Sequence, residues 1–501
     1  MTRNRPDIVW IVADQLHHQA VGYAGNPAVK TPNIDRLAAS GRIFTDAYCQ
    51  QPLCMPSRSS FNTGFYPQTT RVHNNPSQLP DDVPTLADRL KPLGYHTAAF
   101  GHIGGDGLGR RFDRKTDWWD APLRQCMQAE CDALLPGTER LAAHTCGVHP
   151  VPEEELFDVV ATDLAVQAIA EMPSPLFLQL DFYGPHIPWF VPRKYLDLYD
   201  RADIPLPDGW NESVSGKPTS LKGARVATRM EGIGEERLRE ALHHYYARIS
   251  MADAQVGRIL RALEDRGNLE NTVVVFFADH GDYAGEFGMI GKNRFLYDCL
   301  SRVPLVVRTG ARLGTVSGRI DSPVALVDLV PTCLELAGAD VPADLPGRSL
   351  AGPREDFDEQ RAVFASYLNA RGKPVPFDHE WSYDDLEPGP FDPYGSGTCW
   401  GDGCIMVRQG GHKLILYRSG AMELFDLARD PGERRNLYGR EGTAAITHEL
   451  MIRLLQWQMG TGLPDIPQEG LPYHFRSFVR RRIPQKWKAE WDRWQQRVGC
   501  D

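Results

Sequence analysis

Two runs of apolar, largely β-branched residues dominate the pattern of hydrophobic and polar positions along the chain. They are residues 7–13 (DIVWIVA) and residues 272–278 (TVVVFFA). Unbroken runs of this kind are typical of strands that are buried on both faces of a parallel sheet. Two further strands are predicted over residues 97–100 and 176–182 (LFLQLDF), where apolar residues again cluster.

Segments with helical periodicity lie between these strands. Residues 153–171 and 236–266 are predicted as helices, and residues 86–93 as a short helix that stops at Gly94. Thr31 and Pro32 predict another helix start, with Thr as the cap and Pro in the first turn, and Gly41 closes that helix. The alternation predicts an α/β fold with a large mixed, mostly parallel sheet sandwiched by helices.

The composition of the sequence changes after residue 355. Residues 371–403 are rich in Pro, Gly, Asp and aromatic residues, which predicts a long ordered loop. A small antiparallel sheet followed by a helix is predicted from strand-like runs at 404–407, 412–417 and 422–427 and from helical periodicity over 443–459. We therefore predict three parts: a catalytic α/β domain (1–355), a smaller C-terminal α+β domain (356–460) and a tail (461–501).

The tail is basic and carries Trp487, Trp491 and Trp494 at helical spacing. A stripe of this kind favours a docking face over a cofactor site, so we expect it to form a subunit contact in a homo-oligomer.

Composition narrows the classes of function. The 501 residues are 42% hydrophobic and 24% charged, which allows a large buried core. The net charge of −10 argues against nucleic acid as the main partner, although a locally basic pocket can still take a small anion. No secretory leader and no membrane-spanning stretch is evident, so we expect a cytoplasmic protein without membrane contact. The ten cysteines are then expected to be mostly reduced.

The two longest apolar runs each end on an acid, Asp14 and Asp279. Ligands gather at the carboxyl ends of parallel strands, and two carboxylates there can share one hard divalent cation. His280 is a third potential ligand. On pattern alone, Asp14 is also compatible with a simple role in capping a turn.

A compact motif supplies the most specific signal. Residues 54–58 read Cys-Met-Pro-Ser-Arg, and Thr63-Gly64 follow. If Pro56 begins a helix, Cys54 lies at its positive N-terminal end and Arg58, four residues on, can face the same anion. A lone cysteine would be interpreted as a buried free thiol. The whole motif, however, resembles the sulfatase signature Cys-x-Pro-Ser-Arg-x-x-x-x-Thr-Gly and matches every fixed position.

The resemblance to the sulfatase family spans roughly residues 7–437 and implies an alkaline-phosphatase-like fold. It implies that a separate formylglycine-generating maturation enzyme oxidises Cys54 to formylglycine. One hydroxyl of the hydrated aldehyde would then attack sulfur or phosphorus. It also implies that one divalent metal ion, Ca²⁺ first, with Mn²⁺ or Mg²⁺ as alternatives, is held by Asp14, Cys54, Asp279 and His280.

Further site residues follow from the same resemblance. Lys292 resembles the lysine that holds a substrate oxygen and helps the leaving group, and His186 the histidine that protonates the leaving oxygen. Asn75 stands where choline-sulfatase-like and phosphonate monoester hydrolase-like members carry a substrate-contacting asparagine. Taken singly, these would be a solvated lysine, a loop histidine and a turn residue beside Pro76.

The chain departs from the family pattern after residue 100. Many sulfatases carry Gly-Lys-x-His there, whereas this chain has Gly101-His102-Ile103-Gly104. Relatives that cleave phosphonate monoesters and phosphodiesters also lack the Lys-x-His pair. Ala13 before Asp14 is another feature shared with the choline-sulfatase-like and phosphonate-hydrolase-like groups. Our hypothesis is that His102 takes over part of the acid–base or anion-holding role.

Three functions are therefore open. The first is hydrolysis of a small-molecule sulfate monoester, and the second is hydrolysis of a phosphonate monoester or phosphodiester by the same nucleophile. The third is binding by an inactive protein on a sulfatase fold, which the retention of Arg58, Asp279, His280 and Lys292 disfavours.

Two other patterns carry less weight. Residues 104–109 resemble a phosphate loop without its spacing and are predicted as a flexible loop near the pocket. A set of cysteines and histidines also fits no standard zinc-finger spacing, so zinc is not favoured there; it comprises Cys126, Cys131, His144, Cys146 and His149.

Overall fold

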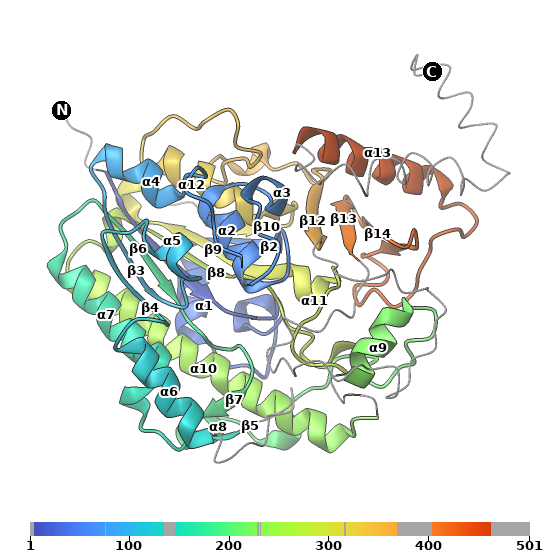
Figure 1. Ribbon diagram of the computed structural model, residues 1–501, viewed down its shortest axis with the longest axis horizontal. Coiled ribbons are helices and arrows are strands. Elements are labelled where there is room, and N and C mark those ends of the chain that lie inside the picture. Colours follow the sequence, from blue (N-terminus) through green and yellow to red (C-terminus); the bar gives the residue numbers. More distant parts are fainter. Residues whose placement is uncertain are drawn as a thin grey trace.

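The computed structural model describes residues 5–75, 77–134, 146–227, 230, 232–314, 317–367 and 403–461. A large sheet lies between two layers of helices, and a smaller sheet packs at one side of it (Figure 1). This architecture confirms the predicted α/β fold with a small antiparallel C-terminal sheet.

The large sheet has nine strands in the described part of the chain. β9 runs antiparallel to both of its neighbours, and the remaining pairs are parallel. The strands are, in spatial order, β10 (Gly318–Ile320), β2 (Arg42–Tyr48), β9 (Arg302–Thr309), β8 (Thr272–Ala278), β1 (Asp7–Ala13), β6 (Leu176–Asp181), β3 (His96–Gly101) and β4 (Arg114–Asp117), with β11 (Val324–Ala325) also paired to β2.

The register of the parallel strands decides where their polar ends lie. Ala13 of β1 pairs with Ala278 of β8, so the residues that follow them, Asp14 and Asp279, leave the sheet side by side. Gly101 of β3 pairs both with Asp181 of β6 and with Asp117 of β4. The carboxyl ends of β8, β1, β6, β3 and β4 therefore form one continuous edge.

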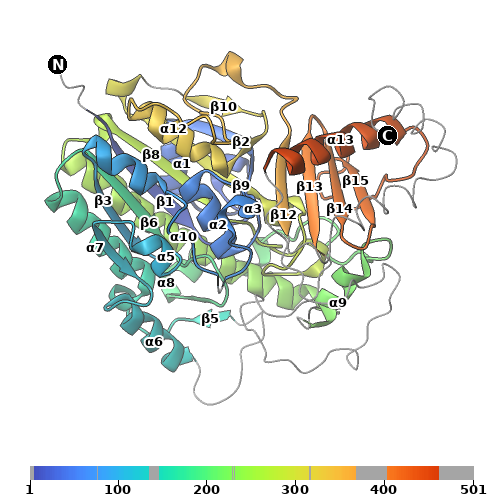
Figure 2. The ribbon, with the colours of Figure 1, turned by 45° about the horizontal axis from the view of Figure 1, so that its top comes forward.

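Helices cover both faces of this sheet, so every residue of β1 and of β8 is buried. One layer contains α1 (Pro32–Ala39), α7 (Phe157–Glu171) and α10 (Glu235–Asp265), and the other contains α2 (Cys54–Thr63), α4 (Leu86–Leu90) and α12 (Leu329–Leu336) (Figures 1 and 2). Trp10 of β1 packs edge-on against Phe61 of α2, with 5.9 Å between ring centroids. This contact fixes α2 against the middle of the sheet.

The remaining elements surround these layers. They are α3 (Pro67–Thr70), α5 (Asp106–Gly109), α6 (Leu123–Leu134), β5 (Cys146–Val148), β7 (Trp189–Val191), α8 (Arg193–Leu196), α9 (Thr219–Ala227) and α11 (Asp298–Ser301). No helix in the part of the chain that the structure describes is long and apolar enough to cross a membrane.

The second sheet is antiparallel and carries α13 (Ala444–Gly460) on one side (Figure 2). Its strands are β12 (Val363–Tyr367), β13 (Cys404–Gln409), β14 (His412–Tyr417) and β15 (Met422–Asp426). The sequence did not predict β12, which in the chain precedes the segment 371–403 that was predicted as a long loop. Residues 371–402 of that segment lie outside the described residues, as does the tail after residue 461, and the predicted domain boundaries stay predictions.

Three local predictions need correction. Thr31 is the N-cap residue of α1, but its side chain donates to Asp35 and does not cap the backbone. Residues 153–171 divide into a 3₁₀ turn (Glu153–Glu155) and α7. Residues 104–109, predicted as a loop, include the short helix α5, because the Gly107 amide donates to Gln78 and the Gly105 amide to Asp117.

Candidate active site

Helix α2 begins at Cys54, slightly before Pro56, where the sequence analysis placed its start, and Cys54 lies at its N-terminal end as expected. Leu53 before it is extended (φ −152°, ψ 138°), and all ten residues of the helix are buried. The side-chain oxygen of Asn75 accepts a hydrogen bond from the Met55 amide at 3.1 Å. Asn75 therefore lies at the N-terminus of α2, beside Cys54, and satisfies one of the amides that a helix start leaves without an internal partner.

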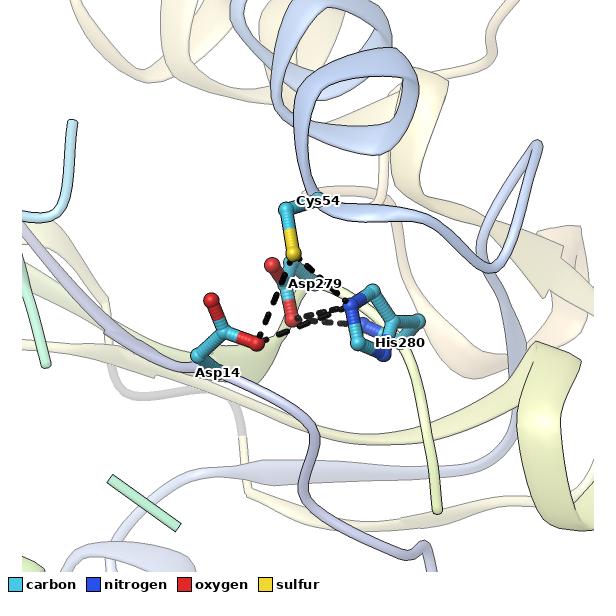
Figure 3. Close-up of side chains that lie close together, drawn as sticks. All are labelled: Asp14, Cys54, Asp279 and His280. Atoms are coloured by element: carbon cyan, nitrogen blue, oxygen red, sulfur yellow. Dashed lines mark hydrogen bonds and ion pairs between the residues drawn. The ribbon is translucent and has the colours of Figure 1, made fainter. Parts of the chain in front are cut away.

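The side chains of Asp14, Asp279 and His280 converge below that of Cys54 (Figure 3). Cys54 Sγ lies 3.8 Å from Asp14 Oδ1 and 3.5 Å from His280 Nε2. His280 Nε2 is 3.6 Å from Asp14 Oδ1 and 3.6 Å from Asp279 Oδ1. All four residues are buried, and their ligand atoms lie within 4.8 Å of one another.

This cluster fits one metal ion. Oxygen ligands bind Ca²⁺ at about 2.3–2.6 Å, so ligands on opposite sides of the ion are about 5 Å apart, close to the observed spread. His280 Nδ1 lies 3.0 Å from the Gly281 carbonyl and donates to it, so the lone pair of Nε2 faces the carboxylates. Asp279 Oδ1 is the oxygen that faces His280, whereas Oδ2 lies 3.0 Å from Arg58 Nη2. Each of these features suits a ligand set.

A buried arginine ties the acids together. Arg58 Nη2 lies 3.1 Å from Asp14 Oδ2 and 3.0 Å from Asp279 Oδ2, and Nη1 lies 2.7 Å from Asp181 Oδ1. Nη1 also donates to the His102 carbonyl. Both terminal nitrogens are thus already engaged by protein oxygens. Of the three guanidinium nitrogens of Arg58, only Nε has no hydrogen bond to the described residues, and it is buried.

Burial and mutual charge set the protonation of the cluster. Burial, together with the charge of Asp14, raises the pKa of Asp279 to about 6. Burial also raises the pKa of Asp181, to about 7, against the opposing effect of Arg58. Burial and Lys292 lower the pKa of His280 to about 3, which keeps its ring neutral and able to bind a cation. Burial and Asp14 raise the pKa of the Cys54 thiol to about 12.

Lys292 and His186 form a second group beside Cys54. Lys292 Nζ lies 2.8 Å from His186 Nε2, while His186 Nδ1 donates to the Ile187 carbonyl at 2.5 Å. Burial and then Lys292 lower the pKa of His186 well below its ordinary value. Burial opposes the charge of Lys292, but Cys54, Asp14 and Asp279 outweigh that effect and raise its pKa.

The structure also places the residues that depart from the family pattern. His102 Nδ1 lies 2.9 Å from Asp14 Oδ2, so the imidazole contacts the four-residue cluster that contains Asp14. Gly104 has φ +114°, and a Cβ there would approach Met55 Sδ to 2.8 Å and Arg58 Cδ to 3.5 Å. The backbone and Met55 thus leave no room for the histidine that many sulfatases carry at this position.

Two residues at this edge were missed by the sequence analysis. Asp181 is the last residue of β6, so it carries the same strand-end signal as Asp14 and Asp279; the predicted strand ran to Phe182 and hid it. Gln15 accepts from Lys292 at 2.7 Å and donates to Asp282 at 2.6 Å, and its φ of +66° turns the chain sharply after Asp14. No local pattern marks Gln15.

The rejected zinc group lies partly outside the described residues. His144 and the side chain of Cys131 are not described, while Cys126 and Cys146 are half-buried and form no disulfide among the described residues.

A model of the sulfatase family matches residues 6–339, which is well over half of the chain. The chain belongs to the sulfatase family. It is accordingly a sulfuric ester hydrolase, and the family assignment made from residues 54–64 is confirmed.

Individual relatives align over most of their length. The choline-sulfatase of Rhizobium meliloti is 27% identical, covering 92% of this chain and 88% of the relative. A solved structure of a 2-O GAG sulfatase is 25% identical with a TM-score of 0.69, and the match covers 91% of this chain and 92% of that one. The phosphonate monoester hydrolase of Agrobacterium radiobacter is 23% identical with a TM-score of 0.72, covering 91% and 96%, and shows the shared fold.

We expect the cluster to bind one divalent cation. Asp279→Asn removes a charged ligand, so it should weaken that binding by about 100-fold or more. Loss of even a hydrogen-bond partner of a metal ligand typically lowers metal affinity by about 10–100-fold. Equilibrium dialysis followed by elemental analysis measures the affinity without any need for turnover.

Asp181→Asn is the matched control. It removes a neighbouring buried carboxylate that also pairs with Arg58 but lies outside the four-residue cluster, so its effect on metal affinity should be much smaller. Equal losses in the two variants would show that the overall negative charge, and not this ligand set, holds the ion.

Proposed function

We propose that this protein hydrolyses sulfate monoesters with a formylglycine nucleophile at position 54 and one bound divalent cation. One observation carries the proposal: Cys54 begins a buried helix and points at Asp14, Asp279 and His280, within a motif that matches the sulfatase signature. The phosphorus-ester alternative uses the same residues and is treated below.

Formylglycine in place of Cys54 suits the surroundings of this side chain. The unmodified thiol has a raised pKa and is therefore a poor nucleophile. A separate maturation enzyme would oxidise it to the aldehyde. When hydrated, the aldehyde supplies a hydroxyl that attacks sulfur and a second hydroxyl whose deprotonation expels sulfate and restores the aldehyde.

Asp14, Asp279, His280 and the oxidised residue 54 would hold the cation. With oxygen at position 54, three of the four ligands are oxygen donors, which hard cations prefer. Ca²⁺ is our first candidate, with Mn²⁺ and Mg²⁺ as alternatives. Bound there, such an ion offsets the charge of the non-bridging sulfate oxygens.

The remaining residues handle the substrate's charge and the proton. We assign Lys292, which lies beside Cys54, and Arg58, through its Nε, to the sulfate oxygens. We assign His186 Nε2 to protonation of the leaving oxygen, with Lys292 Nζ, 2.8 Å away, as the adjacent proton donor. Asn75 at the start of α2 is assigned to substrate contact.

Phosphonate monoesters or phosphodiesters are the second candidate substrates. The observation that favours them is the missing Lys-x-His pair, which phosphonate-cleaving relatives also lack. In its place the site has the uncharged backbone of Gly104 and the imidazole of His102, held by Asp14. We propose that His102 assumes part of the acid–base or anion-holding role.

Mass spectrometry of the tryptic peptide Ile43–Arg58 tests the nucleophile. We expect protein produced together with a formylglycine-generating enzyme to yield a peptide lighter by the difference between thiol and aldehyde, and reactive with a hydrazide. The same peptide contains Cys49, which is buried outside the cluster and serves as an internal control that should stay a thiol. A peptide in which both cysteines alkylate, despite a competent maturation enzyme, contradicts the proposed nucleophile.

His186→Ala tests the route of the proton. An alkyl sulfate has a poor leaving group that needs protonation, so we expect kcat/KM to fall by about 100-fold or more for it. For para-nitrophenyl sulfate, whose leaving group departs as a stable anion, the loss should be about tenfold or less. Steady-state kinetics of both substrates provide the comparison, and equal losses would show that His186 does not protonate the leaving oxygen.

His102→Ala tests the departure from the family pattern. The wild-type protein is first compared on an aryl sulfate, a phenylphosphonate monoester and a phosphodiester, and we expect the sulfate to have the highest kcat/KM. His102→Ala should then lower kcat for that best substrate by about 100-fold, the usual size of an acid–base contribution. An unchanged kcat would eliminate a role for His102, and a faster phosphonate would favour the second candidate.

A further inference from the structure

Two adjacent tryptophans lie at the same sheet edge as the active site. Trp118 and Trp119 directly follow β4, the outermost strand on that side of the sheet. β4 runs parallel to β3, and Asp117 pairs with Gly101, the residue before His102. The tryptophans are therefore placed beside His102 by the same register that places Asp14 beside Asp279.

Aromatic contacts connect this pair to the cluster. The ring centroids of Trp119 and Trp118 are 4.7 Å apart in an edge-to-face arrangement, and those of Trp118 and His102 are 4.8 Å apart. His102 in turn lies 2.9 Å from Asp14. Trp119 is 62% exposed, so a continuous row of rings leads from solvent to His102, which contacts Asp14 of the four-residue cluster.

The turn that carries the indoles is held firmly, and its charges are already paired. Asp117 accepts from the amides of Gly105 and Trp118, each at 2.8 Å. Asp120 accepts from the Asp117 amide at 3.0 Å and from Lys115 at 2.9 Å. The turn consequently offers a ligand the exposed, uncharged ring of Trp119, and the half-buried ring of Trp118 continues from it toward His102.

We propose that Trp118 and Trp119 form a platform that binds the organic group of the sulfate ester at the end remote from the sulfate. This inference rests on the proposed function and adds a substrate class to it. A large exposed indole beside a catalytic site is suited to stacking with a flat apolar ring face. Aryl groups and pyranose sugars both present such a face.

The span of the sheet edge indicates the size of that group. The ring of Trp118 lies 4.8 Å from that of His102 and the ring of Trp119 a further 4.7 Å away, so Trp118 is the nearer ring and Trp119 lies at most about 14 Å from Asp14, which agrees with the three strand positions of about 4.8 Å each between β1 and β4. A short alkyl group attached to sulfate does not reach this far. A two-ring organic group does, so the platform should contribute to binding only for the larger esters.

Trp119→Ala, compared across three substrates, tests the platform. The substrates are methylumbelliferyl sulfate, a sulfated disaccharide and ethyl sulfate, which is too short to reach Trp119. We expect the variant to lower kcat/KM for a ring-bearing ester about tenfold more than for ethyl sulfate, through KM, and Trp119→Phe to restore most of the loss. A loss confined to one ring-bearing ester identifies the aryl or the sugar class.

Tyr438→Ala is the matched control, because it also removes a partly exposed aromatic ring, in the C-terminal part of the chain. It should leave the ratio between the substrates unchanged. Equal effects of Trp119→Ala on all three esters, or no effect on any, would overturn the proposal.

A binding measurement separates this proposal from the proposed function. The two ring-bearing esters are titrated calorimetrically into Cys54→Ala and into Cys54→Ala/Trp119→Ala, neither of which can form the nucleophile. About tenfold weaker binding to the double variant supports the platform even if the wild-type protein hydrolyses none of the three esters. Equal binding, or none to either variant, overturns the platform whatever the activity.

Discussion

Three carboxylates and one guanidinium, all without exposure to solvent, meet at the carboxyl edge of the large sheet. Removing such charges from water costs several kcal/mol per ion, and breaking one partner out of a buried pair is strongly destabilising. Arg58 must therefore lie where Asp14, Asp181 and Asp279 can all contact it. Because Arg58 and Cys54 are four residues apart on α2, the helix that neutralises the acids also presents residue 54 to two of them. Folding of this region and assembly of the site thus depend on the same contacts.

The sheet edge changes in character from one strand to the next. Asp279, His280 and Asp14 follow β8 and β1, Asp181 ends β6, His102 follows β3, and Trp118 and Trp119 follow β4. The charged end suits a cation and an anionic sulfate, and the aromatic end suits an uncharged organic group. Parallel strands make this arrangement simple, since every strand delivers its next residue to the same side. The antiparallel β9 marks the limit of the row on the other side.

The second sheet contributes to the site by packing. Its core residues, Leu424 and Phe425 among them, share a cluster with Tyr48, Leu53 and Tyr297 of the large domain. The Ser366 amide of β12 donates to the Gln50 carbonyl at 2.8 Å, and buried Lys413 of β14 pairs with Asp298 at 2.8 Å. The contact at Gln50 holds the segment between β2 and α2, which leads into Cys54, and Asp298 in turn accepts a hydrogen bond from Tyr48 at the end of β2. The position of Cys54 is therefore set by both sheets.

Local pattern in the sequence determined much of this protein. The bounds of β1 and β8, the place of Cys54 at the N-terminal end of a helix and the family follow from runs or motifs of a few neighbouring residues, since strand burial and helix capping act locally. The acids that end β1 and β8 follow from the same runs, whereas the inclusion of Cys54 in the cluster came from the family resemblance. Other features were decided by the tertiary structure. Asp181 became a partner of Arg58 because β6 lies beside β1, Gly104 became confined because Met55 packs against it, and the tryptophans reached the site because β4 pairs with β3. Strand order and packing between distant segments create these contacts, and no stretch of neighbouring residues encodes them.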